Sequence, residues 1–153
     1  MPRTAFSHVA IGVTDMDRAL AFYCGVLGLK NIYDEIEDVQ QEGVKPYRRH
    51  AVFLSWPGEE HGSFLALDTQ DRTGAVRPVN FSDYGVHHIS LWVDDLDAIH
   101  DRAVKAGCEV MLTPRLLDPN PSLRPFGGGT PVKTTFLRDP DGNVIQLDQA
   151  MEG

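Results

Sequence analysis

The chain has 153 residues, of which 42% are hydrophobic, enough for one compact domain with a sizeable core. Its net charge of −8 argues against nucleic acid as a partner, because an acidic surface repels phosphates. No apolar run approaches the roughly 20 residues of a membrane helix, and the first residues lack a signal-peptide pattern. Two cysteines at no motif spacing suggest reduced thiols, so the sequence predicts a cytoplasmic protein. The lack of a long apolar run predicts that it has no membrane partner.

The two halves of the chain resemble each other with an offset of 80 residues, which places His88 against His8. The matching stretches are residues 8–17 with 88–97 and residues 64–68 with 144–148. Because the register is the same at both ends, the halves are modules of equal length. We expect modules over residues 1–69 and 86–153, joined by a linker over 70–85 and together forming one domain.

Each module opens with a strand in which apolar residues alternate with small or polar ones. This period of two puts His8 and His88 on the strand face opposite the apolar face, and His87 on the same side as the apolar residues. A helix follows in each half, capped by Thr14 or Asp15 and ended by Gly28 in the first, and capped by Asp94 or Asp95 and ended by Gly107 in the second.

Three further strands are expected in each module. The ranges are 29–36, 50–56 and 63–69 in the first, and 108–117, 132–138 and 143–149 in the second. The polar residues 37–49 predict a loop, and the segment 114–131, rich in proline and glycine, predicts a binding loop with Arg124 and Phe126 as contact residues. The fold class is therefore α+β, with two βαβββ modules whose curled sheets form a cup with the helices outside.

This arrangement resembles the vicinal oxygen chelate superfamily. The resemblance rests on the two modules, the strand-opening histidines, the stretch AFYCGVLGL at 21–29 and the stretch FLRDPDGNVIQL at 136–147. The superfamily includes glyoxalase I, methylmalonyl-CoA epimerase, extradiol dioxygenases, fosfomycin-resistance transferases and bleomycin-resistance binding proteins. Resemblance at this level implies the fold and a homodimer, and does not choose among the activities.

Metal-binding members of the superfamily take ligands from up to four positions, which correspond here to His8, Ala66, His88 and Gln146. Ala66 has no ligand atom, so the resemblance implies a site of two histidines and one amide. Such a site would hold a divalent ion (Fe, Mn, Zn or Ni) with open positions for two oxygens of a substrate. Asp148, two residues further along the same strand face, is placed to orient a ligand.

Other candidate residues follow from the same resemblance. His61 lies near the position of the acid–base histidine of extradiol dioxygenases. Phe136 stands where those enzymes have a tyrosine, and it cannot donate a proton. Trp56 is its expected repeat mate, and Trp56, Trp92, Phe126 and Phe136 form an expected aromatic lining that would favour a flat apolar ligand.

Two functions remain open on this reading. One is a metal-dependent lyase, isomerase or dioxygenase that acts on a small oxygenated metabolite. The other is a metal-free binding protein of the bleomycin-resistance type that sequesters an aromatic drug or natural product. Both hypotheses require a small-molecule ligand.

Overall fold

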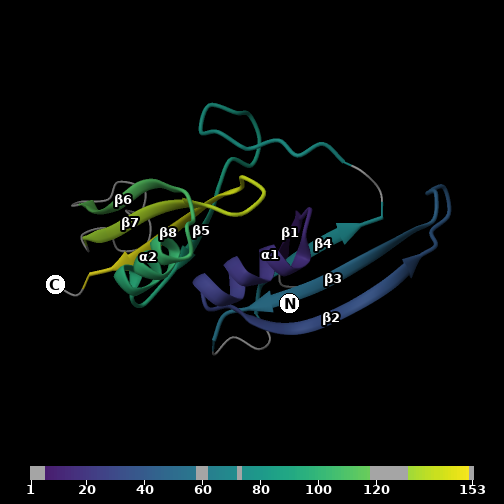
Figure 1. The fold of residues 1–153 in the computed structure, drawn as a ribbon, viewed down its shortest axis with the longest axis horizontal. Coiled ribbons are helices and arrows are strands. Elements are labelled where there is room, and N and C mark those ends of the chain that lie inside the picture. Colours follow the sequence, from purple (N-terminus) through teal and green to yellow (C-terminus); the bar gives the residue numbers. More distant parts are fainter. Residues whose placement is uncertain (1–5, 58–61, 72–73, 118–130, 152–153) are drawn as a thin grey trace, which may run out of the picture. The chain divides into compact units, whose positions relative to one another are not determined.

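The computed structural model describes residues 6–57, 62–71, 74–117 and 131–151 and divides the chain into two units, Met1–Val76 and Arg77–Gly153 (Figure 1). The division falls inside the expected linker. Candidate residues His61, Arg124 and Phe126 lie outside the described residues. Among the helices described, none is long and apolar enough to cross a membrane.

Each unit contains one four-stranded sheet with the same topology, as the α+β reading predicted. Unit 1 contains β1 (His8–Gly12), α1 (Met16–Leu20), a π-helical continuation η1 (Ala21–Val26), β2 (Lys30–Val39), β3 (Tyr47–Ser55) and β4 (Phe64–Gln70). Unit 2 contains β5 (Ile89–Trp92), α2 (Leu96–Lys105), β6 (Val110–Leu117), β7 (Val132–Arg138) and β8 (Val144–Ala150). The strand orders are β1-β4-β3-β2 and β5-β8-β7-β6, with the first pair of each sheet parallel and the others antiparallel.

The helices begin and end where the sequence indicates. Asp15 accepts a hydrogen bond from the amide of Arg18, and Asp95 accepts one from the amide of Ala98, each at 3.0 Å. Gly28 and Gly107 follow the helices with φ of 84° and 74°, a conformation that favours glycine.

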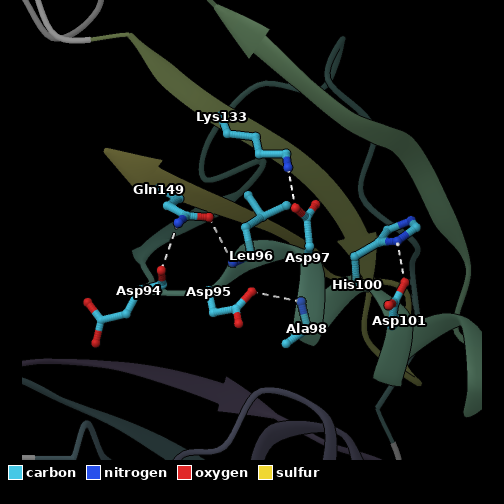
Figure 2. A network of polar contacts seen from close by, with 9 residues as sticks. All are labelled: Asp94, Asp95, Leu96, Asp97, Ala98, His100, Asp101, Lys133 and Gln149. Carbon is cyan, nitrogen blue, oxygen red and sulfur yellow. Dashed lines mark hydrogen bonds and ion pairs between the residues drawn. The ribbon is translucent and has the colours of Figure 1, made fainter. Parts of the chain in front are cut away.

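Helix α2 is anchored to the sheet at its first turn. Figure 2 shows Gln149 of β8 accepting a hydrogen bond from the amide of Leu96 and donating one to the carbonyl of Asp94. Lys133 of β7 forms an ion pair with Asp97. The buried apolar side chains on this side of the sheet and on the helix are Leu91, Leu96, Ile99, Ala103, Leu137, Ile145 and Leu147. By strand alternation, the opposite face carries Ser90, Gln146 and Asp148.

The offset of 80 residues is preserved where β1 pairs with β4 and β5 pairs with β8. Ala10 pairs with Ala66 as Ser90 pairs with Gln146. The predicted equivalence of positions 66 and 146 is therefore confirmed.

The same offset fails on the next strand. Phe53 pairs with Ala66, and Phe136 pairs with Gln146, so the mate of Phe136 is Phe53 and the assignment of Trp56 is wrong. The cause is a difference in turn length, because eight residues (56–63) connect β3 to β4 and five (139–143) connect β7 to β8.

The predicted loop over 37–49 is wrong at both ends, because residues 37–39 belong to β2 and residues 47–49 to β3. β2 and β3 pair from Lys30 opposite Ser55 to Val39 opposite Tyr47. Polar residues on both faces resembled a loop, but cross-strand contacts join them. Arg49 lies 2.8 Å from Glu37, and His50 lies 2.6 Å from Asp34.

The second half of the expected linker is held on unit 2. The Arg138 guanidinium donates hydrogen bonds to the carbonyls of Val79 (2.7 Å) and Gly142 (2.6 Å) and to the side chain of Asn80 (3.2 Å). Gly142 has φ of 88°, and a Cβ there would lie 2.9 Å from a side-chain atom of Pro78. These contacts hold residues 78–80 on unit 2, and the next residue, Phe81, lies against the ring of His88.

Candidate metal and substrate site

Asp148 is the centre of a small hydrogen-bonded group on the open face of the unit 2 sheet. Its carboxylate is almost fully buried. It accepts a hydrogen bond from Ser90 Oγ at 2.7 Å, and the Gln146 amide nitrogen lies 2.9 and 2.8 Å from its two oxygens. A carboxylate can only accept, so the amide NH₂ must face Asp148. The carbonyl oxygen of Gln146 is therefore the atom left to bind a ligand.

His88 lies just before β5 and is held by its neighbour. Its Nδ1 is 2.7 Å from Nδ1 of His87. Desolvation by burial lowers the pKa of His88, the charge of His87 lowers it further, and Asp148 opposes both. The ring is thus favoured in its neutral form, and when Nδ1 carries the proton, Nε2 is free to bind a metal.

The expectation that His87 points away from His88 is wrong. The two rings are tilted against each other with centroids 4.7 Å apart. Strand alternation does not apply here, because β5 begins only at Ile89.

An aromatic cluster surrounds His88. The ring of Phe81 meets that of Phe136 edge to face at 5.1 Å and that of His88 at 6.2 Å. Phe136 and His88 are 5.9 Å apart, again edge to face. Trp92, with 55% of its surface exposed, shares the sheet face with Gln146 and Asp148.

In unit 1, His8 is arranged much as His88 is. Its Nδ1 lies 3.1 Å from the hydroxyl of Ser7, the residue before it. Its Nε2 makes no hydrogen bond to any residue that the structure describes, and the same is true of His88. In both modules, therefore, the preceding side chain contacts Nδ1 and leaves Nε2 available.

A row of stacked rings crosses the unit 1 sheet from β1 to β2. His8 stacks on Phe64 at 4.8 Å, Phe64 lies 4.9 Å from Phe53, and Phe53 stacks on Tyr33 at 4.6 Å. The register places all four on one face. The row ends in polar contacts, since the Tyr33 hydroxyl donates to Glu37 at 2.6 Å and Arg49 donates to Glu37 at 2.8 Å.

Asp68, the repeat mate of Asp148, has a different environment. Its Oδ2 accepts a hydrogen bond from Gln70 at 3.0 Å, whereas its buried Oδ1 has no partner within the described chain. Ala10 and Ala66 occupy the positions of Ser90 and Gln146. The two donors that satisfy Asp148 are thus both absent in unit 1.

Sequence reasoning placed Gln146 and Phe136 correctly on one sheet face, and Trp92 with them. Trp56 is half-buried just beyond β3. The reasoning missed Phe53, Phe64, Phe81, His87 and the difference between Asp68 and Asp148. Alternation along β4 could have indicated Phe64 and Asp68, since both are an even number of residues from Ala66.

The donor set fits a metal ion in its chemistry. Neutral imidazoles and an amide oxygen are ligands that Fe, Mn, Zn and Ni accept. Asp148 behind Gln146 is the kind of outer carboxylate that orients a ligand. Within the described residues no cluster of three or more His, Cys, Asp or Glu side chains suits a metal ion. The expected ligand set of His8, His88 and Gln146 draws on both units and stays a prediction.

A family model described as the Glyoxalase/Bleomycin resistance protein/Dioxygenase superfamily matches residues 5–147. The chain belongs to this superfamily, and the predicted resemblance is confirmed.

Individual relatives agree with this assignment. A probable lactoylglutathione lyase of Vibrio cholerae is 29% identical over 142 residues, which cover 93% of this chain and 88% of the relative. A glyoxalase family protein from Bacillus cereus has a TM-score of 0.80 at 16% identity, covering 99% and 97% of the two chains. A genomically encoded fosfomycin resistance protein from Listeria monocytogenes has a TM-score of 0.62 at 14% identity, covering 98% and 96%. At these identities the solved structures show a common fold.

Proposed function

We propose that the protein is a divalent-metal-dependent enzyme that acts on a small oxygenated metabolite. His8, His88 and Gln146 would hold the ion, which when bound would supply Lewis-acid polarisation of two substrate oxygens. The observation that carries the proposal is the contact of the Gln146 amide with both oxygens of Asp148. With the amide nitrogen on Asp148, the carbonyl oxygen of Gln146 is the atom that faces away from Asp148 and can bind a ligand.

The charges of the chain's own residues favour an anionic form of the substrate. His88 is favoured as neutral and Gln146 carries no charge, so neither reduces the positive charge of a bound ion. The carboxylate of Asp148 already accepts hydrogen bonds from Ser90 and Gln146. An enolate or another oxyanion would therefore be bound more strongly than a neutral carbonyl compound.

Lyase or isomerase chemistry is the form we propose. The Vibrio cholerae relative named above bears the name of a lyase, and Phe136 cannot supply the proton that a tyrosine would. The role of His61 as acid–base residue stays a prediction.

Elemental analysis tests the proposal directly. Protein purified without added metal or a histidine tag is analysed as isolated and after incubation with Fe, Mn, Zn or Ni salts. We expect one transition-metal ion per chain, and its loss in His88→Ala, because one imidazole and one amide make a poor site. Absence of metal under every condition would overturn the proposal.

Metal-free binding of an aromatic compound is the second candidate. The ring row of unit 1 and the edge-to-face cluster of unit 2 favour it, because such surfaces suit flat apolar ligands. A protein that takes up no metal but binds aromatic compounds would support this alternative.

A further inference from the structure

The internal repeat identifies an acceptor, Asp68 Oδ1, that no donor in the described part of the chain satisfies. In unit 2, Asp148 accepts hydrogen bonds from Ser90 on the neighbouring strand β5 and from Gln146 on its own strand. In unit 1, alanines replace both donors, and Asp68 Oδ1 is buried without a partner in the described chain. A buried acceptor left unpaired is costly, so an external donor at this place would be strongly favoured.

Three neighbours of Asp68 on its sheet face are small, and a fourth, Gln70, donates a hydrogen bond to its Oδ2. The register pairs it with Gly12 on β1 and Ala51 on β3, and Ala66 precedes it by two residues on the same face. Ala10 and Gly12 are exposed, and Asp68 as a whole is only half-buried. Oδ1 itself has almost no exposed surface, so a ligand would reach it from the side of the edge strand β1, past Ala10 and Gly12.

Arg49, a cation on which the charge of Asp68 acts, is already engaged. Arg49 forms a hydrogen bond and ion pair with Glu37, and this contact, with a smaller effect of the Asp68 charge, raises the pKa of Arg49. Arg49 forms no hydrogen bond with Asp68 that the structure describes. A carboxylate binds a charged donor more strongly than a neutral one. The net charge of −8 adds a general attraction for cations.

An apolar surface adjoins the carboxylate. Phe53 pairs with Ala66 and is therefore the diagonal neighbour of Asp68, at about 7–8 Å. Because Phe53 and Phe64 pack against each other and stand in one row, they can present ring edges to a ligand. Ring edges suit the face of a flat apolar group.

We propose that Asp68 binds an ammonium group of the substrate, with the adjoining flat apolar part of the same molecule against Phe53 and Phe64. This inference rests on the proposed function, and it deepens it by naming the substrate class: an oxygenated metabolite that also carries an amine. His8 and Asp68 are separated by four residues of strand, about 13 Å, because His8 pairs with Phe64 and Gly12 with Asp68. A substrate that reaches both ends is extended.

Benzylamine is the probe, with benzoate as its anionic counterpart. Binding is followed through the backbone amide signals of Gly12 and Asp68 in ¹⁵N-labelled full-length protein. We expect benzylamine to shift these signals with a millimolar Kd and benzoate to leave them unchanged. Asp68→Asn should weaken the binding of benzylamine at least tenfold. Asp148→Asn should weaken it less than twofold, because the carboxylate of Asp148 already has its hydrogen-bond donors.

Ala10→Ser is a second variant that adds a donor and removes nothing. It reproduces the Ser90–Asp148 contact in unit 1, so it should raise Tm by about 2–4 °C and compete with benzylamine, weakening its binding at least tenfold. Equal binding of benzylamine and benzoate, unaltered binding in both Asp68→Asn and Ala10→Ser, or no shift in the parent would overturn the inference.

A Mn²⁺ titration separates this result from the proposed function. Asp68→Asn and Ala10→Ser should bind Mn²⁺ within twofold of the parent, since neither residue is a proposed ligand. A parent protein that binds benzylamine but no metal would overturn the enzyme proposal and leave the amine site standing. A parent protein that binds metal but not benzylamine would overturn the amine site and leave the enzyme proposal standing.

Discussion

Gln146→Glu tests the pairing of Gln146 with Asp148 and the role of Gln146 as a metal ligand in one experiment. In the parent, the amide nitrogen lies within 2.9 Å of both oxygens of an almost fully buried carboxylate. Glutamate removes this donor and places a second carboxylate against the first. A hydrogen bond to a charged group contributes about 1.5–3 kcal/mol, so we expect a loss of about 2 kcal/mol without metal. For a chain of this size this lowers Tm by about 4–8 °C.

Bound metal should reduce the difference in stability between the variant and the parent. A carboxylate attracts a divalent ion more strongly than an amide does, and each tenfold gain in affinity adds about 1.4 kcal/mol once the ion is in excess. Thermal unfolding followed by circular dichroism, in EDTA and again in Mn²⁺, measures both effects. The variant should unfold below the parent in EDTA, and its Tm should increase more than that of the parent when Mn²⁺ replaces EDTA.

Gln146→Met is the matched control, because it keeps the length of the side chain and removes the donor, the acceptor and any charge. It should be destabilised under both conditions and gain little from Mn²⁺. If Gln146→Glu were as stable as the parent in EDTA, the amide would not stabilise Asp148. If Mn²⁺ stabilised Gln146→Met as much as Gln146→Glu, residue 146 would not be a ligand.

Three further predictions follow from other contacts. The pKa of His88, followed by NMR, should lie below the usual histidine value near 6.5. The folded state then binds this proton less tightly than the unfolded chain does. The protonation of His88 should therefore leave stability unchanged above about pH 6.5 and lower it increasingly as the pH falls below that value. The hydrogen bond to Glu37 raises the pKa of the Tyr33 phenol, so Glu37→Gln should lower it in an ultraviolet titration, and an unchanged phenol titration would contradict the contact. Light scattering should give a homodimer, twice the chain mass of 17.0 kDa, and a monomer at micromolar concentration would contradict this.

The period of two and the repeat were sufficient to predict the strands and the face that bears Gln146, because both depend on local alternation. They were not sufficient where register depends on turn length. The additional three residues between β3 and β4 shift the mate of Phe136 from Trp56 to Phe53. The outer part of the β2–β3 hairpin was missed because its stability depends on pairs such as Glu37 with Arg49, which lie twelve positions apart in the chain.

The site was predictable by residue type but not by partner. The sequence indicates that His8 and His88 are equivalent, yet it does not show that Ser7 and His87 contact their Nδ1 atoms. The contact of Phe81 with the site could not be predicted, because Phe81 lies in the expected linker and its position depends on the hydrogen bonds of Arg138 to Val79 and Asn80.

The turn between β7 and β8 makes the two modules unequal in their tolerance of insertions and deletions. The carboxylate of Asp139 accepts hydrogen bonds from the amides of Asp141 and Asn143 and from the Asn143 side chain, at 2.7–3.0 Å. One added residue in this turn would move Gln146 to the helix-covered face, since a shift of one position reverses the face of every side chain in a strand. The longer connection over 56–63 leads to Ala66, which has no ligand atom to displace. Changes in length between homologues should therefore accumulate in the first module, while the second keeps its five-residue turn.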